Sequence, residues 1–233
     1  TVTGRMFVGS NAGVLCYDPD SGLLRPALLP GADYRAFGYI GSFIDDERQL
    51  WLGSADGLTI IDIDRRRPDG TFPYRYLRYR LDDSMSEVSE KPTCFCHTPD
   101  GIMWIGTNGH GIYRGERDGS GEYVYRVYTV SDGLSHNIVK GVTVDGTGHL
   151  WVATINGLSC FNPVSETFMN YSAADGLPCN QFYWNAAYRT SDGRLLFGST
   201  CGIAEIEPDN EEIRVSRNPV VFTRLLVGNN VVN

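Results

Sequence analysis

Short runs of alternating hydrophobic and polar residues, separated by glycine-rich turns, follow one another along most of this chain. In the clearest case, residues 138–144 alternate and are rich in β-branched side chains, which is typical of a strand. Residues 145–148 follow as a tight turn, in which glycine supplies the positive φ. Three further strands are predicted at residues 149–154, 158–161 and 167–171. This stretch therefore predicts a four-stranded antiparallel meander.

The same meander recurs along the chain, with one bulky residue at an equivalent position in each unit. These anchors are Phe7, Trp51, Trp104, Trp151 and Leu196, and the steps between them are 44, 53, 47 and 45 residues. Further strands are predicted at residues 41–44, 49–54, 58–62, 74–79, 93–97, 102–107, 111–114, 123–128, 182–188, 195–199 and 203–206. Repetition at this period indicates supersecondary units that are stacked or arranged around an axis.

A radial arrangement explains how such units bury their surfaces. One four-stranded sheet cannot cover both of its own faces, whereas blades set around an axis cover each other, with the anchors as core residues between them. The chain lacks the 3.6-residue hydrophobic period of helices, which argues against a helical solenoid. The sequence thus predicts an all-β fold, a β-propeller built from four-stranded antiparallel blades.

Composition narrows the class of protein further. Of the 233 residues, 42% are hydrophobic, which is enough for a substantial core. The net charge of −8 argues against a nucleic-acid partner, because binding to phosphates depends on clustered cations. No stretch approaches the roughly 18–20 apolar residues of a membrane-spanning helix. The chain begins at Thr1 without a leader sequence, so we expect it to be part of a longer protein.

The six cysteines are too few for a disulfide scaffold in a chain of this length. Cys94 and Cys96 would share one face of a strand, a spacing unlike that of a zinc knuckle. We therefore expect buried free thiols. If one disulfide forms, we expect it between Cys179 and Cys201, because both lie in predicted loops of one blade.

Two motifs carry a resemblance to a known repeat. The first, Asp-x-x-Gly-x-Leu-Trp-[Ile/Val]-[Gly/Ala]-Thr-x-x-Gly-[Leu/Ile], is present at residues 145–158 and more loosely at 100–112. The second, Asp-Gly-Leu-x-x-Asn, is present at residues 132–137 and 175–180. With these motifs the chain resembles the regulator-propeller repeat of bacterial two-component proteins, found in the periplasmic sensor regions of Bacteroides-type hybrid histidine kinases.

The C-terminal residues extend this resemblance. Residues 219–228 resemble the first strand of the triple-tyrosine, immunoglobulin-like domain that follows such propellers. The resemblance implies propeller blades at residues 1–217, the first of them incomplete, and the start of that domain at residues 218–233. Such proteins have two seven-bladed propellers in series, so five units would form an open arc whose exposed end faces favour self-association. A closed five-bladed ring is the alternative.

Loops that enter the first strand of a blade emerge at the same end as those that join its second and third strands. Amide and aromatic groups gathered there suit a polyhydroxylated ligand, because amides bond to hydroxyls and rings cover apolar sugar faces. The resemblance implies an oligosaccharide. The candidate residues are Asp56, Asn108, His110, His136, Asn137, Asn156, Asn180, Gln181, Tyr183 and Trp184. The alternative is local structure, since Asn before Gly favours turns, and Asn137 and Asn180 would cap their loops.

Catalytic motifs are missing from the sequence. The four histidines lie in separate contexts, without a His-x-x-x-His pair, a nucleophile elbow or a phosphate-binding loop. We therefore expect no enzyme activity, cofactor or metal in this segment, and any kinase activity would belong to C-terminal domains outside it. The remaining alternative of this kind is a lyase of the streptogramin type that would use His110 and His136.

The resemblance implies a periplasmic sensor segment that responds to oligosaccharides and controls genes for glycan use. The resemblance implies an upstream propeller and the downstream immunoglobulin-like domain as partners within one protein. It also implies a homodimer of the full-length protein, attached to the membrane through other segments. A structural or protein-interaction propeller without a ligand of its own is the main alternative.

Overall fold

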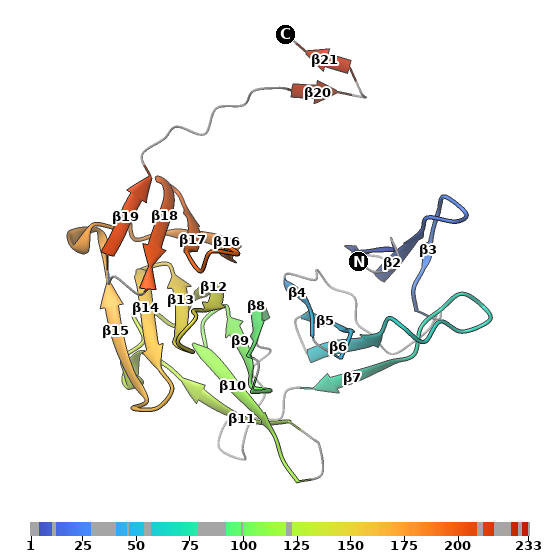
Figure 1. Cartoon of the computed structure of the whole chain (residues 1–233). Coiled ribbons are helices and arrows are strands. Elements are labelled where there is room, and N and C mark those ends of the chain that lie inside the picture. Colours follow the sequence, from blue (N-terminus) through green and yellow to red (C-terminus); the bar gives the residue numbers. More distant parts are fainter. Residues whose placement is uncertain are drawn as a thin grey trace.

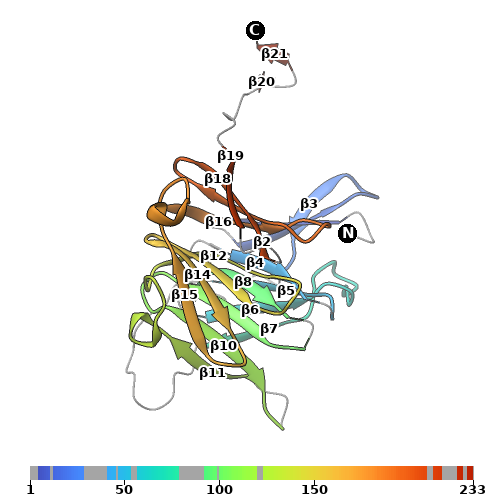
Figure 2. The same ribbon diagram turned by 60° about the vertical axis from the view of Figure 1, so that its left-hand side comes forward.

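Five antiparallel β-sheets follow one another along an open arc (Figure 1, Figure 2). The computed structural model describes residues 5–10, 13–28, 41–45, 47–53, 57–78, 92–98, 100–119, 123–208, 212–216, 225–227 and 230–232. The predicted all-β propeller of about five blades is confirmed. The closed five-bladed ring is wrong, because the arc is open between its first and last sheets (Figure 1). No helix in the described ranges is long and apolar enough to cross a membrane.

Each sheet is one blade, whose strands pair in chain order. The first two blades contain β1 (Met6–Ser10), β2 (Gly13–Asp18) and β3 (Leu23–Pro26), then β4 (Gly41–Ile44), β5 (Gln49–Gly53), β6 (Gly57–Asp62) and β7 (Tyr74–Arg78). The next two contain β8 (Pro92–His97), β9 (Met103–Thr107), β10 (Ile112–Arg117) and β11 (Tyr123–Tyr128), then β12 (Val139–Val144), β13 (Leu150–Thr154), β14 (Gly157–Asn162) and β15 (Thr167–Tyr171). The fifth contains β16 (Phe182–Arg189), β17 (Leu195–Ser199), β18 (Gly202–Glu207) and β19 (Glu212–Ser216).

The first strands of the four-stranded blades lie next to one another along the inside of the arc, in the order β4, β8, β12 and β16. The first blade has three strands in the described part of the chain. Its β1 pairs Phe7 with Cys16, just as β5 of the second blade pairs Trp51 with Ile60. β1 therefore corresponds to the second strand of the other blades.

The bulky anchors fill the spaces between neighbouring blades. Trp51, Trp104 and Trp151 are 0%, 2% and 5% exposed, and each lies in a cluster with side chains of the following blade. Phe7 and Leu196, in the two end blades, are only half-buried. The prediction that the anchors are core residues is therefore confirmed, and it holds most fully in the middle of the arc.

The cysteines differ in their exposure, and all six are free thiols. Cys16 and Cys94 are buried, whereas Cys96, Cys160 and Cys179 are half-buried. Cys201 is exposed, so the prediction of buried thiols is wrong for this residue, which lies in the turn between β17 and β18.

Beyond the blades, β20 (Leu225–Val227) and β21 (Asn230–Val232) pair with each other as a hairpin. Residues 217–224, which precede this hairpin, lie outside the described residues. The start of an immunoglobulin-like domain at residues 218–233 therefore stays a prediction. Asp56 of the candidate site also lies outside the described residues.

Candidate functional site

Backbone hydrogen bonds join neighbouring blades at the end where the inter-blade loops emerge. The N–H groups of Gly109 and Gly111, in the turn between β9 and β10, donate to the Asn137 carbonyl at 3.2 and 2.9 Å. One blade further on, the Gly157 N–H donates to the Asn180 carbonyl at 2.8 Å. The structure therefore brings both kinds of loop to one end of the molecule, as the meander predicts. This end is called the loop end below.

The two Asp-Gly-Leu-x-x-Asn loops are closed by their own side chains. Asn137 Oδ1 accepts a hydrogen bond from the Val130 N–H at 2.9 Å, and Asn180 Oδ1 accepts one from the Ala173 N–H at 2.7 Å. The glycine of each motif is left-handed, with φ of 107° and 103°. The leucine of each motif is buried: Leu134 and Leu177. The capping alternative is confirmed for Asn137 and Asn180, because their side-chain oxygens accept hydrogen bonds from backbone N–H groups of their own loops.

The other two asparagine candidates occupy turns between the second and third strands of their blades. Asn108 forms an isolated backbone bridge with Ile138 of the next blade. The Asn156 N–H donates to Thr154 Oγ1 at 2.9 Å, which is a local turn contact. The side chains of Asn108 and Asn156 are exposed, so their amides face the solvent at the loop end.

The two histidine candidates are also engaged in local structure. His136 Nδ1 accepts a hydrogen bond from the Ile138 N–H at 2.9 Å, which ties the ring to its own loop. His110 is half-buried, and its N–H donates to Thr107 Oγ1 at 3.1 Å. The described residues contain no group of three or more His, Cys, Asp or Glu that could hold a metal ion.

An insertion in β16 presents the two aromatic candidates. Phe182 and Ala187 are five residues apart in β16, whereas their partners in β17, Ser199 and Phe197, are two residues apart. The inner strand β16 therefore carries three extra residues. Tyr183 and Trp184 lie in this bulge and are 57% and 42% exposed. Asn185 follows with a left-handed backbone, at φ 53°. The bulge therefore holds two large aromatic side chains out of the core, close to the loop end.

Lys140 lies directly over one of these rings. It is the extra residue of a smaller bulge in β12, between Val139 and Gly141. Its Nζ atom is 3.0 Å from the centroid of the Trp184 ring, and burial lowers the pKa of this lysine. We call Lys140, Tyr183 and Trp184 the aromatic platform. Sequence reasoning missed Lys140, although a lysine within the otherwise apolar run 138–144 was the signal that could have shown it.

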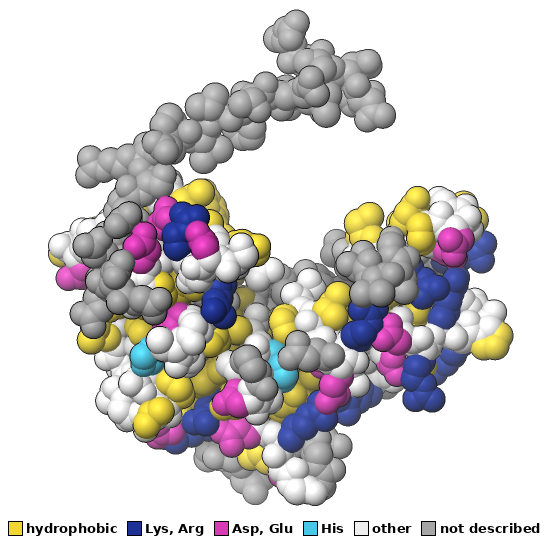
Figure 3. Space-filling model, viewed as in Figure 1, with side chains coloured by type: hydrophobic (Ala, Val, Ile, Leu, Met, Phe, Trp, Pro, Cys, Tyr) yellow, Lys and Arg dark blue, Asp and Glu magenta, His cyan; other side chains and the backbone are white. Residues whose placement is uncertain are grey.

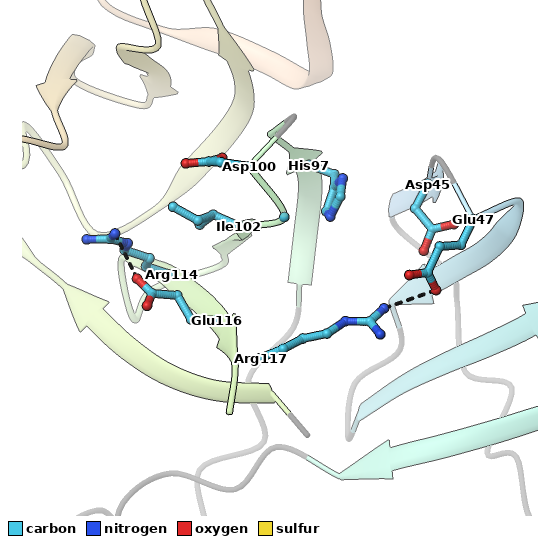
Figure 4. Close-up of a pocket in the computed structure, with 9 residues that line it drawn as sticks. Asp45, Glu47, His97, Asp100, Ile102, Arg114, Glu116 and Arg117 are labelled. Carbon is cyan, nitrogen blue, oxygen red and sulfur yellow. Dashed lines mark hydrogen bonds and ion pairs between the residues drawn. The ribbon is translucent and has the colours of Figure 1, made fainter. Parts of the chain in front are cut away.

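A cavity of about 460 Å³ lies between the second and third blades, near the turns at the opposite end (Figure 4). Its wall comes from the β4–β5 turn, the end of β8, the β8–β9 turn and β10: Asp45, Glu47, His97, Asp100, Gly101, Ile102, Arg114, Glu116 and Arg117. Arg117 reaches Glu47 of the neighbouring blade at 3.2 Å, and Arg114 pairs with Glu116 at 2.7 Å. The cavity therefore has a polar wall in which charges of both signs are paired. The repeat motif at residues 100–112 includes part of this wall, but no sequence pattern marks the cavity, because residues of two blades meet there only in the fold.

Hydrophobic side chains are exposed on the two blades that border the gap in the arc (Figure 3). On the first blade, Met6 and Leu24 are 56% and 50% exposed. On the fifth blade, Tyr188 and Ile203 are 65% and 40% exposed. These residues lie on the outer faces of the end blades, whereas the opposite faces pack on the neighbouring blades.

Comparison with known sequences identifies the repeat. The family model for the two component regulator propeller matches residues 86–109. A relative named Histidine kinase P4, from Formosa agariphila, is 25% identical over 194 residues, which cover 82% of this chain. This chain spans 13% of the length of that relative. Residues 86–109 thus match the regulator-propeller repeat that the motifs predicted.

Solved structures share the fold at low sequence identity. One match is the extracellular domain of a B. thetaiotaomicron protein that is named as a hybrid two component system. Its TM-score is 0.68 and its identity 19%, over 98% of this chain and 31% of that one. Catalytically inactive virginiamycin B lyase from Staphylococcus aureus, with Quinupristin, matches with a TM-score of 0.61 and 16% identity, over 91% of this chain and 66% of that one. At these identities the likeness establishes the β-propeller architecture.

Proposed function

We propose that this chain, which carries a regulator-propeller repeat, is a propeller segment of the extracytoplasmic sensor region of a hybrid two-component protein. We further propose that it binds oligosaccharides at its loop end. The histidine kinase relative and the fold shared with the extracellular domain of a hybrid system support the first part. The second part rests on one observation, the exposed pair Tyr183 and Trp184 on an insertion in β16.

The chemistry of the platform suits a sugar. An exposed aromatic ring covers the apolar face of a pyranose, and neighbouring polar groups bond to its hydroxyls. Lys140 supplies ammonium donors beside the Trp184 ring, and Gln181 is exposed at the start of β16. The platform thus combines a stacking surface with donors and an amide, without a group suited to cleaving a glycosidic bond.

The position of the platform connects it to the joints between blades. Gln181, two residues before Tyr183, accepts a hydrogen bond from the Thr200 N–H at 3.0 Å. The preceding Asn180 accepts the bond from Gly157 of the fourth blade. A ligand on the platform would therefore stiffen the joint between the fourth and fifth blades, and the change would pass to neighbouring domains. In this proposal kinase activity, dimerisation and control of glycan-use genes belong to the full-length protein.

Calorimetric titration of the full-length extracytoplasmic region with a panel of neutral and acidic oligosaccharides tests the proposal. Trp184→Ala and Tyr183→Ala are expected to weaken binding about tenfold each, which corresponds to ~1.4 kcal/mol. Tyr188→Ala is the matched control, because Tyr188 lies on the same strand, is more exposed and is outside the insertion. Absence of binding across the panel, or an equal loss in the control, would contradict the proposal.

The exposed hydrophobic residues of the end blades favour a second candidate function, a propeller that acts through protein contacts. Tyr188 and Ile203 are exposed on the outer face of the fifth blade. In this case Tyr188→Lys with Ile203→Lys would abolish signalling by the full-length protein, while Tyr183→Ala with Trp184→Ala would leave it intact. A signalling assay of both double variants separates the two functions.

A further inference from the structure

Two cysteine thiols meet at the loop end of the fifth blade, and one of them lies a few residues before the aromatic platform in the chain. Cys179 lies in the loop that leads into β16, and Cys201 lies in the turn between β17 and β18. Both sulfur atoms contact the Thr200 hydroxyl, at 3.1 Å from Cys179 Sγ and 3.7 Å from Cys201 Sγ. The Thr200 N–H also donates to the Gln181 carbonyl at 3.0 Å, so backbone contacts hold the two segments together.

The two thiols also differ in acidity. Burial raises the pKa of Cys179, but hydrogen bonds with Cys201, Thr200 and Ser199 outweigh it and lower the pKa to about 6. The contact with Cys179 raises the pKa of Cys201. At neutral pH this pair therefore carries one thiolate, on Cys179, next to one protonated thiol. A low-pKa thiolate beside a second thiol is the arrangement that favours disulfide exchange.

The remaining half-buried and buried thiols provide a contrast. Burial raises the pKa values of Cys94, Cys96 and Cys160 to about 12. Cys16 is buried and its pKa is raised for the same reason. These four thiols are protonated at neutral pH and react slowly with disulfides, because the thiolate is the reacting form.

We propose that Cys179 and Cys201 form a redox-active pair that is oxidised to a disulfide by small-molecule or protein disulfides. The Cys179 thiolate attacks one sulfur of the external disulfide, which forms a mixed disulfide and releases one thiolate. That thiolate takes the proton of Cys201, and the Cys201 thiolate then attacks Cys179 Sγ and releases the second external sulfur as a thiolate. The two cysteine sulfurs are oxidised to one disulfide, and the external disulfide is reduced to one thiol and one thiolate, which solvent protonates according to its pKa.

The bond would enclose the part of the chain that carries the platform. Residues 180–200 lie between the two cysteines and include the whole insertion of β16 with Tyr183 and Trp184. Oxidation would tie the loop before β16 to the β17–β18 turn and restrict the movement of the platform. This inference goes beyond the proposed function, since the bond forms whether or not the platform binds a sugar.

Incubation of the reduced protein with glutathione disulfide at neutral pH, followed by intact and peptide mass spectrometry, tests the pair. The wild type is expected to lose the mass of two hydrogen atoms and to yield a peptide that joins Cys179 to Cys201. Cys201→Ser is expected to stop at a glutathione adduct on Cys179, and Cys179→Ser to form no adduct at Cys201 on that time scale. Cys160→Ser is the control and is expected to match the wild type.

A second measurement uses the wild type alone and does not depend on the folding of any variant. Iodoacetamide at neutral pH is expected to alkylate Cys179 more than roughly tenfold faster than Cys160, because only the former is a thiolate. Equal alkylation rates would overturn the proposal. So would a glutathione adduct on wild-type Cys179 that persists without forming the internal bond.

Discussion

Asp145 Oδ2 accepts a hydrogen bond from the indole Nε1 of Trp151 at 2.8 Å, six residues further along the chain. Asp45 and Trp51 repeat this contact in the second blade, also at 2.8 Å. Both carboxylates are buried, and each also accepts a hydrogen bond from the backbone of its own turn. The aspartate therefore ties the turn between the first and second strands to the anchor between blades, which explains its place in the repeat motif.

Threonine replaces the aspartate in two blades. Thr98 precedes Trp104 by six residues, and Thr190 precedes Leu196 by six. The Ile102 N–H donates to Thr98 Oγ1 at 3.2 Å, so the hydroxyl takes over the contact with the turn. In each of the four-stranded blades, a side-chain oxygen thus holds the turn between the first and second strands. The direct bond to the indole is present in the second and fourth blades.

Replacing Asp145 by Asn should destabilise the protein. The amide oxygen can still accept from the turn, but the indole N–H of Trp151 then faces an NH₂ group and remains buried without an acceptor. Such a loss costs about 1–3 kcal/mol in the free energy of unfolding, which urea denaturation measures. Asp192→Asn is the control, because its side chain is 57% exposed, and a change within about 0.5 kcal/mol is expected there. Equal stabilities of the wild type and Asp145→Asn would exclude an anchoring role.

The same contact predicts how stability depends on pH. Burial raises the pKa of Asp145, but hydrogen bonds from Trp151, Thr147 and His149 outweigh it and hold the pKa below its ordinary value. The unfolded chain therefore binds a proton at this site more readily than the folded chain does. The stabilisation is complete above the unfolded pKa of about 3.9 and is lost as the pH falls through the folded pKa. The stability gap between the wild type and Asp145→Asn should shrink below about pH 4 in urea titrations at several pH values.

The blade architecture could be predicted because it rests on local patterns. Alternation and turn glycines place a strand at residues 167–171, where β15 is found. β19 (Glu212–Ser216) was missed, because charged residues interrupt its apolar positions and no turn glycine precedes it. Arg48 shows that a left-handed turn position is not always occupied by glycine, so glycine alone does not locate every such turn. It adopts φ 59° where the fourth blade has Gly148 at φ 90°.

The candidate site was only partly predictable, because it depends on contacts between blades. Turn chemistry correctly indicated that Asn137 and Asn180 would cap their loops. Periodicity does not reveal that β16 carries extra residues, since the bulge shows only when β16 is paired with β17. Periodicity also does not predict the contact between Lys140 and Trp184, because these residues belong to different blades.

Two glycines at turns should respond differently to the same substitution. Gly148→Ala places a methyl group in open space, so its cost is that of a left-handed alanine, about 1–2 kcal/mol. Gly157→Ala adds a collision, because the new Cβ would lie 2.2 Å from the Tyr171 carbonyl oxygen of the neighbouring strand. Its loss in unfolding free energy should therefore exceed that of Gly148→Ala. Thermal unfolding of both variants tests this order, and equal melting temperatures would contradict it.

Truncating an anchor should cost most in the middle of the arc. Trp104 is 2% exposed and lies 5.5 Å from the Phe161 ring of the next blade, so Trp104→Ala leaves a cavity and costs about 3–5 kcal/mol. Leu196 occupies the same position in the fifth blade but is half-buried, so Leu196→Ala should cost less than about 2 kcal/mol. Urea unfolding of both variants measures the difference.

The Leu196 substitution also reports on what covers the fifth blade in a longer form of the protein. If a further blade packs on this face, Leu196 becomes a fully buried leucine, and its replacement by alanine should cost about 2–5 kcal/mol there. Trp104→Ala is the internal reference, because its surroundings are complete within these five blades and its cost should be the same at both chain lengths. A Leu196→Ala cost that does not rise with chain length would show that the outer face of the fifth blade remains open to solvent, available for contacts with another protein.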